Sequence, residues 1–279
     1  MLRLIDGKQL AQQRRDEIKK TVETLKQQGI VPGLAVILVG NDSASQVYVR
    51  NKEKACQEVG FYSEVYRLPE STTQEQLLQL IDRLNKDDKI HGLLVQLPVP
   101  AHIDEKAVIH AISPLKDVDG FLPENMGALL IGEPGAEPCT PKGCLDLIKQ
   151  TGISIAGKKA VVVGRSNIVG KPMAIMLLRE HATVTICHSR TKNLKEELLA
   201  ADIIVAAIGK ANFITGDMIK DGAVVIDVGM NRLENGKLAG DVDRASLENR
   251  DCWLTPVPGG VGPMTITMLL KNTLESAMR

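Results

Sequence analysis

The stretch Val161-Val162-Val163-Gly164-Arg165-Ser166-Asn167-Ile168-Val169-Gly170 decides the fold expected for this chain of 279 residues. Its three valines predict a buried strand, and the two glycines bound a turn that leads into a helix. Glycine at such a turn lets a phosphate approach the backbone N–H groups of the helix N-terminus. The spacing is Gly-x5-Gly and not Gly-x-Gly-x-x-Gly, so an ordinary strand-to-helix turn is the alternative.

Strand-like and helix-like segments alternate on both sides of this turn. That alternation is typical of an α/β fold with a mainly parallel sheet. Asp42 and Ser43 can cap a helix after the first buried strand, and a helix is expected over residues 73–85. The expected strands are residues 34–39, 62–68, 90–97, 159–163, 183–186, 203–207 and 224–228.

The turn-rich segment 132–138 (GEPGAEP) is the best candidate for a domain boundary. We therefore expect one domain over residues 1–139 and a nucleotide-binding domain over residues 140–262. After Pro263 the chain predicts a single terminal helix. We expect this helix, residues 263–279, to return to the first domain and complete it.

Composition excludes several classes of function. The 34 basic and 34 acidic residues leave no net charge to attract nucleic acid or an anionic membrane. Three Phe, three Tyr and one Trp are too few for platforms that stack single-stranded nucleic acid. No long apolar run or signal core is present, so we expect a cytoplasmic protein. The five cysteines include no Cys-x-x-Cys pair and are expected to be reduced thiols, with no metal site.

Tyr48 and Lys52 lie four residues apart and more than 100 residues before the glycine turn. If this segment is helical, Ser45, Tyr48 and Lys52 share one face. A solvated helix face is the alternative, but the helix directly follows a buried strand, where ligands gather in parallel sheets. A lysine partly removed from water becomes usable as an acid or base near neutrality. Because the chemistry precedes the nucleotide turn, we expect the two to occupy different domains.

Three further segments offer polar or glycine-rich strand ends. Gln96 follows a strand and can position a water or a planar heterocycle, although a polar residue at a strand end is the alternative. Asp117 and Asp119 precede Gly120, where aspartates often only cap a turn. The segment 255–263 (TPVPGGVGP) predicts a rigid loop, poor in side chains, that a ligand can approach closely.

The strand after the glycine turn favours NADP over NAD. An NAD site usually has an acidic residue there to bind the ribose hydroxyl, but residues 187–190 are Cys-His-Ser-Arg. Ser189 and Arg190, with Arg165 from the turn, can bind a 2′-phosphate through charge-assisted hydrogen bonds. A solvated surface role for Arg190 is the alternative.

Taken together, these segments resemble the bifunctional methylenetetrahydrofolate dehydrogenase/methenyltetrahydrofolate cyclohydrolase family. The matching stretches span nearly the whole chain in family order, and they are Gly40-x4-Ser45-x2-Tyr48-x3-Lys52, Val95–Pro98, Lys116–Gly120, Pro138–Pro141, Gly164-Arg165-Ser166-x2-Val169-Gly170-x-Pro172 and Pro256–Pro263. One departure is Met230, where the family often has Ile, and this exchange roughly conserves apolar volume.

The resemblance implies two α/β domains around a cleft, the second a Rossmann-like NADP-binding domain. It also implies two consecutive reactions on tetrahydrofolate derivatives and a homodimer. The implied catalytic residues are Lys52 as acid/base, Gln96 as its partner, Tyr48 against the folate and Asp119 as pterin anchor. Further substrate contacts are implied for Val49, Arg50, Asn51, Val95, Leu97, Pro258, Gly259, Gly260, Val261 and Gly262, and cofactor contacts for Gly164, Arg165, Ser166, Ser189, Arg190 and Met230.

Two alternatives come from other classes. A short-chain-type or shikimate-type NADP oxidoreductase would use Tyr48 or Lys52 on a carbonyl or alcohol, but in the short-chain type the nucleotide turn comes first. The glycine-rich loop before Pro263 has no obvious place in either. A non-catalytic NADP-sensing protein could keep the same fold. It would be expected to lose Lys52 or Gln96, and both are present.

Overall fold

The computed structural model describes residues 1–279, which form two compact units. The N-unit comprises Gln12–Cys139 and Ile266–Arg279, and the C-unit comprises Met1–Ala11 and Thr140–Thr265. The chain passes between the units within helix α1 (Gly7–Gln27), at the start of α6 (Cys139–Gln150) and within α9 (Val261–Ala277).

The observed division differs from the expected boundaries at the N-terminus. Strand β1 (Arg3–Leu4) pairs in parallel with β11 (Trp253–Leu254) and so belongs to the sheet of the C-unit. The Arg3 amide donates to the Cys252 carbonyl at 2.8 Å. A strand of two residues is too short to show an alternating pattern, so this pairing could not be predicted from the local sequence.

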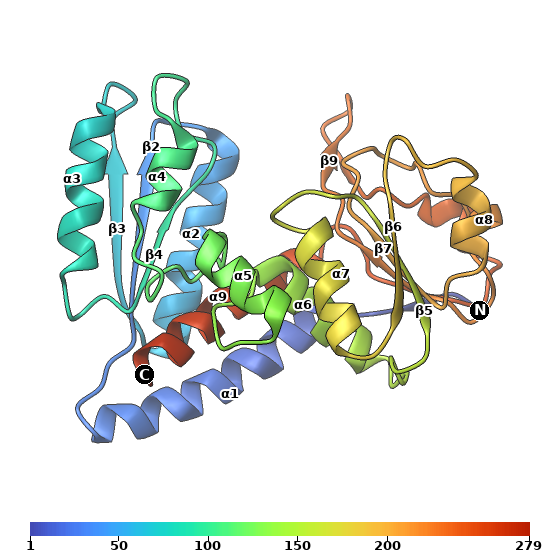
Figure 1. Ribbon diagram of the computed structural model, residues 1–279, viewed down its shortest axis with the longest axis horizontal. Coiled ribbons are helices and arrows are strands. Elements are labelled where there is room, and N and C mark those ends of the chain that lie inside the picture. Colours follow the sequence, from blue (N-terminus) through green and yellow to red (C-terminus); the bar gives the residue numbers. More distant parts are fainter. The chain divides into compact units, whose positions relative to one another are not determined.

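The N-unit contains a three-stranded parallel sheet in the order β3-β2-β4. Its central strand β2 (Gly33–Val39) is buried throughout, between β3 (Tyr62–Leu68) and β4 (Gly92–Val95). Alternate residues of β2 pack in one core with Leu77, Ile81 and Leu84 of α3. Helices α2 and α3 flank the strands in Figure 1. The helices that lie wholly in this unit are α2 (Ser43–Val59), α3 (Gln74–Asn85), α4 (Glu105–His110) and α5 (Pro123–Ile131).

The C-unit contains a six-stranded sheet in the order β1-β11-β8-β7-β5-β6, with every neighbouring pair parallel. Strand β5 (Lys159–Val163) lies between β6 (Thr183–Cys187) and β7 (Ile203–Ala206), so the strand order reverses at β5. Dinucleotides bind at such a reversal, beyond the carboxyl ends of the strands. Its remaining elements are α7 (Gly170–Arg179), α8 (Leu194–Leu199), η1 (Gly216–Met218), β8 (Val224–Asp227), β9 (Asn231–Arg232), β10 (Leu238–Ala239) and η2 (Arg244–Leu247).

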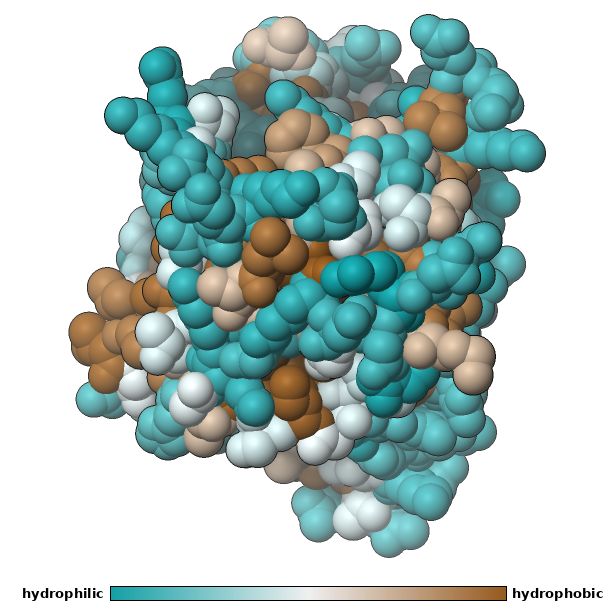
Figure 2. Space-filling view, turned by 90° about the vertical axis from the view of Figure 1, so that its right-hand side faces the viewer, coloured by the Kyte–Doolittle hydropathy of each residue, from teal (hydrophilic) through white to brown (hydrophobic).

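The prediction of an α/β chain with parallel sheets is therefore confirmed. The strand expected over 90–97 is shorter, and the terminal helix begins two residues before Pro263. Helix α1 was not predicted, because its apolar residues are sparse among many Lys, Gln and Arg. No helix is both long enough and apolar enough to cross a membrane. Figure 2 shows a face on which hydrophilic side chains predominate and hydrophobic ones form small separate groups.

Candidate functional site

Helix α2 directs Lys52 toward the sheet of the N-unit. The Asp42 side chain caps this helix by accepting the Ser45 amide at 2.7 Å. Buried residues of α2 include Ser45, Val49, Cys56 and Val59, which form one helical stripe. Lys52 follows Val49 by three residues and precedes Cys56 by four, so it lies on this stripe and is partly buried. A lysine in the middle of a core-facing stripe is not a solvated surface charge.

Lys52 meets Gln96 at the carboxyl end of β4. The Lys52 ammonium donates a hydrogen bond to Gln96 Oε1 at 3.1 Å. Gln96 Nε2 donates to the Leu97 carbonyl at 2.9 Å, and the Gln96 amide donates to the Ile37 carbonyl at 2.8 Å. These contacts fix the orientation of the Gln96 side chain, with its oxygen toward Lys52.

The two aspartates of the Lys116–Gly120 turn have different environments. The Asp117 side chain accepts hydrogen bonds from Gly120 N at 3.1 Å, Leu122 N at 2.9 Å and Asn125 Nδ2 at 2.8 Å. It therefore holds the turn together. Burial raises the pKa of Asp119; the nearby Lys52 charge acts to lower it, and the Asp117 charge to raise it further. Asp119 thus lies within electrostatic reach of Lys52.

Helix α9 supports this turn from within the N-unit. The buried Asn272 Nδ2 donates to the Val118 and Glu137 carbonyls, both at 2.8 Å. The turn itself runs beside β4, because the Leu93 amide donates to the Lys116 carbonyl at 2.8 Å. Asp119 is therefore held at the same edge of the sheet as Gln96.

The other predicted residues of the N-unit have mixed placements. Tyr48 precedes Lys52 by one helical turn and is partly buried, and this burial raises the pKa of its hydroxyl. Val49 and Val95 are buried in the interior, and Asn51 is exposed. Arg50 lines a separate cavity of about 450 Å³, together with Leu38, Gly40, Asn41, Gln46, Arg67, Leu68 and Pro69. The structure therefore groups Tyr48 with Lys52 on α2 and gives Arg50 different neighbours.

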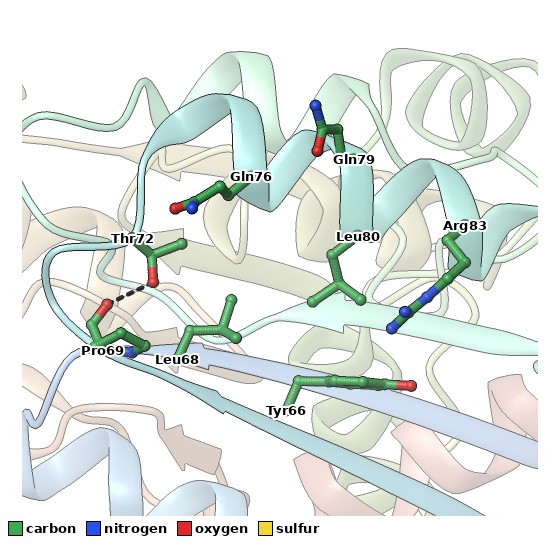
Figure 3. A pocket seen from close by; sticks show the side chains of 8 residues that line it. All are labelled: Tyr66, Leu68, Pro69, Thr72, Gln76, Gln79, Leu80 and Arg83. Atoms are coloured by element: carbon green, nitrogen blue, oxygen red, sulfur yellow. Dashed lines mark hydrogen bonds between the residues drawn. The ribbon is translucent and has the colours of Figure 1, made fainter.

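A larger cavity of about 610 Å³ lies between α3 and the end of β3. Figure 3 shows side chains of α3 above Tyr66 and Leu68, with the Thr72 hydroxyl donating to the Pro69 carbonyl at 2.7 Å. The Arg83 guanidinium lies 5.7 Å from the centre of the Tyr66 ring. None of the predicted site residues lines this cavity, so it is distinct from the group formed by Lys52, Gln96 and Asp119.

In the C-unit, the Gly164–Gly170 turn is closely packed. A Cβ on Gly164 would lie 2.3 Å from the Ala207 carbonyl oxygen, and one on Gly170 would lie 2.3 Å from the Gly164 oxygen. The Ser166 hydroxyl accepts the Val169 and Gly170 amides at 3.1 and 3.3 Å. Arg165 and Ser166 are exposed beside this glycine cradle, which leads into the N-terminus of α7, and helix N-termini suit phosphate binding.

The residues expected to contact the two ends of a bound dinucleotide, Ser189 and Arg190 at one end and Met230 at the other, are also exposed. Ser189 and Arg190 follow β6 in a turn where the Arg190 amide donates to His188 Nδ1 at 3.1 Å. Met230 is 45% exposed, and a Cβ on Gly262 would lie 3.6 Å from its terminal methyl. The loop that contains Gly259 and Gly260 packs against the start of α1, since a Cβ on Gly7 would lie 2.0 Å from the Gly260 oxygen. Met230 therefore adjoins the glycine-rich loop predicted from the sequence.

Comparison with known proteins assigns both parts of the chain. The model of the tetrahydrofolate dehydrogenase/cyclohydrolase catalytic domain matches residues 5–119, and that of the NAD(P)-binding domain of the same family matches residues 138–279. The chain belongs to the tetrahydrofolate dehydrogenase/cyclohydrolase family. It is 64% identical over 276 residues to the bifunctional protein FolD of Moorella thermoacetica, which covers 99% of each chain.

Solved structures of the family agree over the full length. The FolD methylenetetrahydrofolate dehydrogenase/cyclohydrolase of Campylobacter jejuni is 51% identical, covers 100% of this chain and 99% of its own, and has a TM-score of 0.96. The Trypanosoma brucei dehydrogenase-cyclohydrolase, solved with NADP and an inhibitor, is 41% identical, covers 99% and 97%, and has a TM-score of 0.93. The chain is thus a dehydrogenase/cyclohydrolase of folate one-carbon metabolism with a C-terminal NAD(P)-binding domain.

Family membership rules out the short-chain and shikimate alternatives. All five cysteines are buried and none forms a disulfide, and no three His, Cys, Asp or Glu side chains gather where they could hold a metal ion. Asn272 was not predicted, because a single Asn in an apolar helix carries no recognisable signal. Asp227 and Asp241, two buried carboxylates of the C-unit, were not predicted either.

Proposed function

We propose that the N-unit binds 5,10-methylenetetrahydrofolate at the Lys52, Gln96 and Asp119 group. There it is oxidised with NADP to the methenyl form and then hydrolysed to 10-formyltetrahydrofolate. The observation that carries the proposal is the hydrogen bond from the Lys52 ammonium to Gln96 Oε1, at the sheet edge that also holds Asp119.

Asp119 has the properties of a pterin anchor. Its carboxylate can accept two hydrogen bonds from the amino and ring N–H groups of a pterin. Asp117 cannot serve in this way, because its oxygens already accept three hydrogen bonds within the turn. The charge of Lys52 favours the ionised form of Asp119 despite the burial that raises its pKa.

Lys52 acts as the acid/base of the hydration step. Its partner Gln96 is neutral, so the ammonium is oriented without being held by a carboxylate. The methenyl carbon is already electrophilic, and its hydration needs a positioned water and a proton transfer, but no metal. Gln96 supplies the oxygen that orients Lys52 and helps to place this water.

Tyr48 packs against the folate one helical turn before Lys52. Burial raises the pKa of its hydroxyl, so the ring remains a neutral phenol at physiological pH. A neutral aromatic ring suits contact with the planar part of folate. The contacts implied by resemblance for Val49, Arg50, Asn51, Val95 and Leu97, and for the loop Pro258–Gly262, belong to the same proposal.

The C-unit fits NADP. The glycine cradle of Gly164 and Gly170 leads into the N-terminus of α7, which suits a phosphate, and exposed Ser189 and Arg190 stand where β6 has no carboxylate to bind a ribose hydroxyl. Arg190 therefore pairs with the 2′-phosphate, and Arg165 and Ser166 hold the phosphates at the turn. When bound, NADP supplies the hydride acceptor; the chain contributes alignment of the two reactants.

The proposal includes a homodimer in the cytoplasm. Strand β6 is an edge strand of the C-unit sheet, with Ile186 39% exposed on it and Leu178 57% exposed on the neighbouring α7. An exposed edge offers unpaired backbone groups to a second chain. Sedimentation analysis should give a dimer for the natural chain and a monomer for Ile186→Pro, because the Ile186 N–H points away from β5; a monomeric natural chain would contradict it.

The decisive experiment follows the absorbance of the methenyl product. Purified protein with 5,10-methylenetetrahydrofolate should form this chromophore with NADP and then lose it through hydrolysis. NAD should support the first step less well. Cofactor binding without any turnover would favour a non-catalytic sensing protein and would overturn the proposal.

A further inference from the structure

Two buried carboxylates lie beyond the carboxyl ends of the C-unit strands and take no part in the chemistry above. Asp227 is the last residue of β8 and is 2% exposed, and Asp241 follows β10 and is fully buried. Carboxylates this deep in a protein are rare unless their oxygens are fully hydrogen-bonded. The hydrogen-bond donors of the Asp227 and Asp241 carboxylates show which backbone segments these side chains hold in place.

Asp241 binds three consecutive backbone amides after β7. Its Oδ2 accepts the Ile208 and Gly209 amides at 2.6 and 3.0 Å, and its Oδ1 accepts the Lys210 amide at 2.9 Å. Asn231 Nδ2 also donates to Oδ1, at 3.0 Å. Successive N–H groups that converge in this way form an anion-binding nest, and here the anion is a side chain of the protein itself.

Asp227 in turn fixes Asp241. Its Oδ1 accepts the Gly229 and Asp241 amides at 2.9 Å, and its Oδ2 accepts the Val242 amide at 2.9 Å. Glycines make room for both carboxylates. A Cβ on Gly229 would lie 2.3 Å from Asp241 Oδ1, and one on Gly240 would lie 1.9 Å from Asp227 Oδ2.

The segments held in this way border the nucleotide turn. The Ala207 amide donates to the Val163 carbonyl at 2.8 Å, and the Ala207 oxygen faces Gly164. In a sheet of this topology the dinucleotide crosses the strand reversal, with its adenosine ribose beside the second strand. That strand is β6, so the ends of β7 and β8 face the nicotinamide half.

We propose that Asp241, braced by Asp227, is a positioning residue that sets segments 207–210 and 229–231 for the nicotinamide half of the cofactor. This inference rests on the proposed use of NADP. By filling the nest after β7, Asp241 also keeps those three amides from binding a cofactor phosphate. The pyrophosphate is thereby directed to the Gly164–Gly170 turn.

The test compares Asp241→Ala with Asp243→Ala, which removes the same charge two residues away. Calorimetry measures the NADP dissociation constant, and the hydrolysis of methenyltetrahydrofolate is measured without cofactor. For Asp241→Ala we expect a dissociation constant raised roughly tenfold or more and a hydrolysis rate within about twofold of the natural chain. Formate, which can replace the lost carboxylate, should restore NADP affinity to Asp241→Ala only. Asp243→Ala should resemble the natural chain.

Unchanged NADP affinity in folded Asp241→Ala would overturn the inference. Equal losses of NADP affinity and of the hydrolysis rate that formate does not reverse would also overturn it, because that result indicates a purely structural role. If Asp241→Ala does not fold, Asp241→Asn retains one acceptor oxygen and is measured in the same way. There too, natural NADP affinity would overturn the inference. A natural chain that itself fails to bind NADP would instead refute the proposed function.

Discussion

Asp117 and Asp119 lie two residues apart, yet replacing them should have opposite consequences. Asp117→Ala leaves three N–H donors without their acceptor in a buried turn. Each unsatisfied donor costs about 1–3 kcal/mol, so we expect the free energy of unfolding to fall by about 4 kcal/mol. Asp119→Ala should change it by less than about 1 kcal/mol, because burial disfavours the charge that is removed.

Urea denaturation followed by far-ultraviolet circular dichroism measures both effects, because the single Trp lies in the C-unit and does not report on this turn. Binding of a folate analogue should be weakened more by the Asp119 substitution than by the Asp117 substitution. Asp119→Ala should raise the dissociation constant roughly 100-fold through the loss of charge-assisted hydrogen bonds. Asp117→Asn, which keeps one acceptor oxygen, provides a folded comparison. Equal destabilisation by Asp117→Ala and Asp119→Ala would refute the division of roles.

Three further predictions concern the residues proposed to bind NADP and one histidine. Arg190→Ala and Ser189→Ala should each weaken NADP binding roughly tenfold more than NAD binding, by calorimetry, and equal effects would exclude a 2′-phosphate contact. Gly170→Ala should abolish cofactor binding but leave hydrolysis of the methenyl compound intact, since its Cβ would meet the Gly164 oxygen at 2.3 Å; retained NADP affinity would contradict the tight cradle. Burial, with a smaller contribution from the Lys116 charge, lowers the pKa of His91, whose Nδ1 accepts the Gly33 amide at 3.1 Å. Stability should therefore be lost as pH falls below the ordinary His value of 6.5, where the unfolded chain takes up the proton first. His91→Gln should flatten this dependence in denaturation experiments at several pH values, and an unchanged slope would count against it.

Much of the fold could be predicted because the buried strands are continuous apolar runs bounded by glycine. The expected strand at 34–39 lies within the buried β2, and the expected helix at 73–85 coincides with α3, which Thr73 caps; the expected strand at 62–68 also coincides with β3, although β3 is only partly buried. Strand β1 escaped prediction, because two residues contain no periodicity and its pairing depends on the distant β11. Long-range pairing of short segments is a property of the assembled sheet, not of the local sequence.

The Lys52 group could be anticipated in part. The sequence indicates that Lys52 and Gln96 each follow a buried strand, and parallel strands bring such ends to one edge of the sheet. The residue pattern by itself did not distinguish Asp117 from Asp119, which only the family resemblance separated, because the difference lies in which backbone amides each carboxylate meets after folding. Asp227 and Asp241 were missed for the same reason: a carboxylate that binds backbone amides has no motif of its own.

The rate of methenyltetrahydrofolate hydrolysis by Lys52→Met shows whether Lys52 is the acid/base of the hydration step. The Lys52 ammonium is the acid/base in this account, so the rate should fall roughly 100-fold or more, with the circular dichroism spectrum and NADP affinity unchanged. Lys54→Met, an exposed lysine of the same helix, should hydrolyse at the natural rate. Hydrolysis by Lys52→Met as fast as by the natural chain would show that Lys52 is not the acid/base.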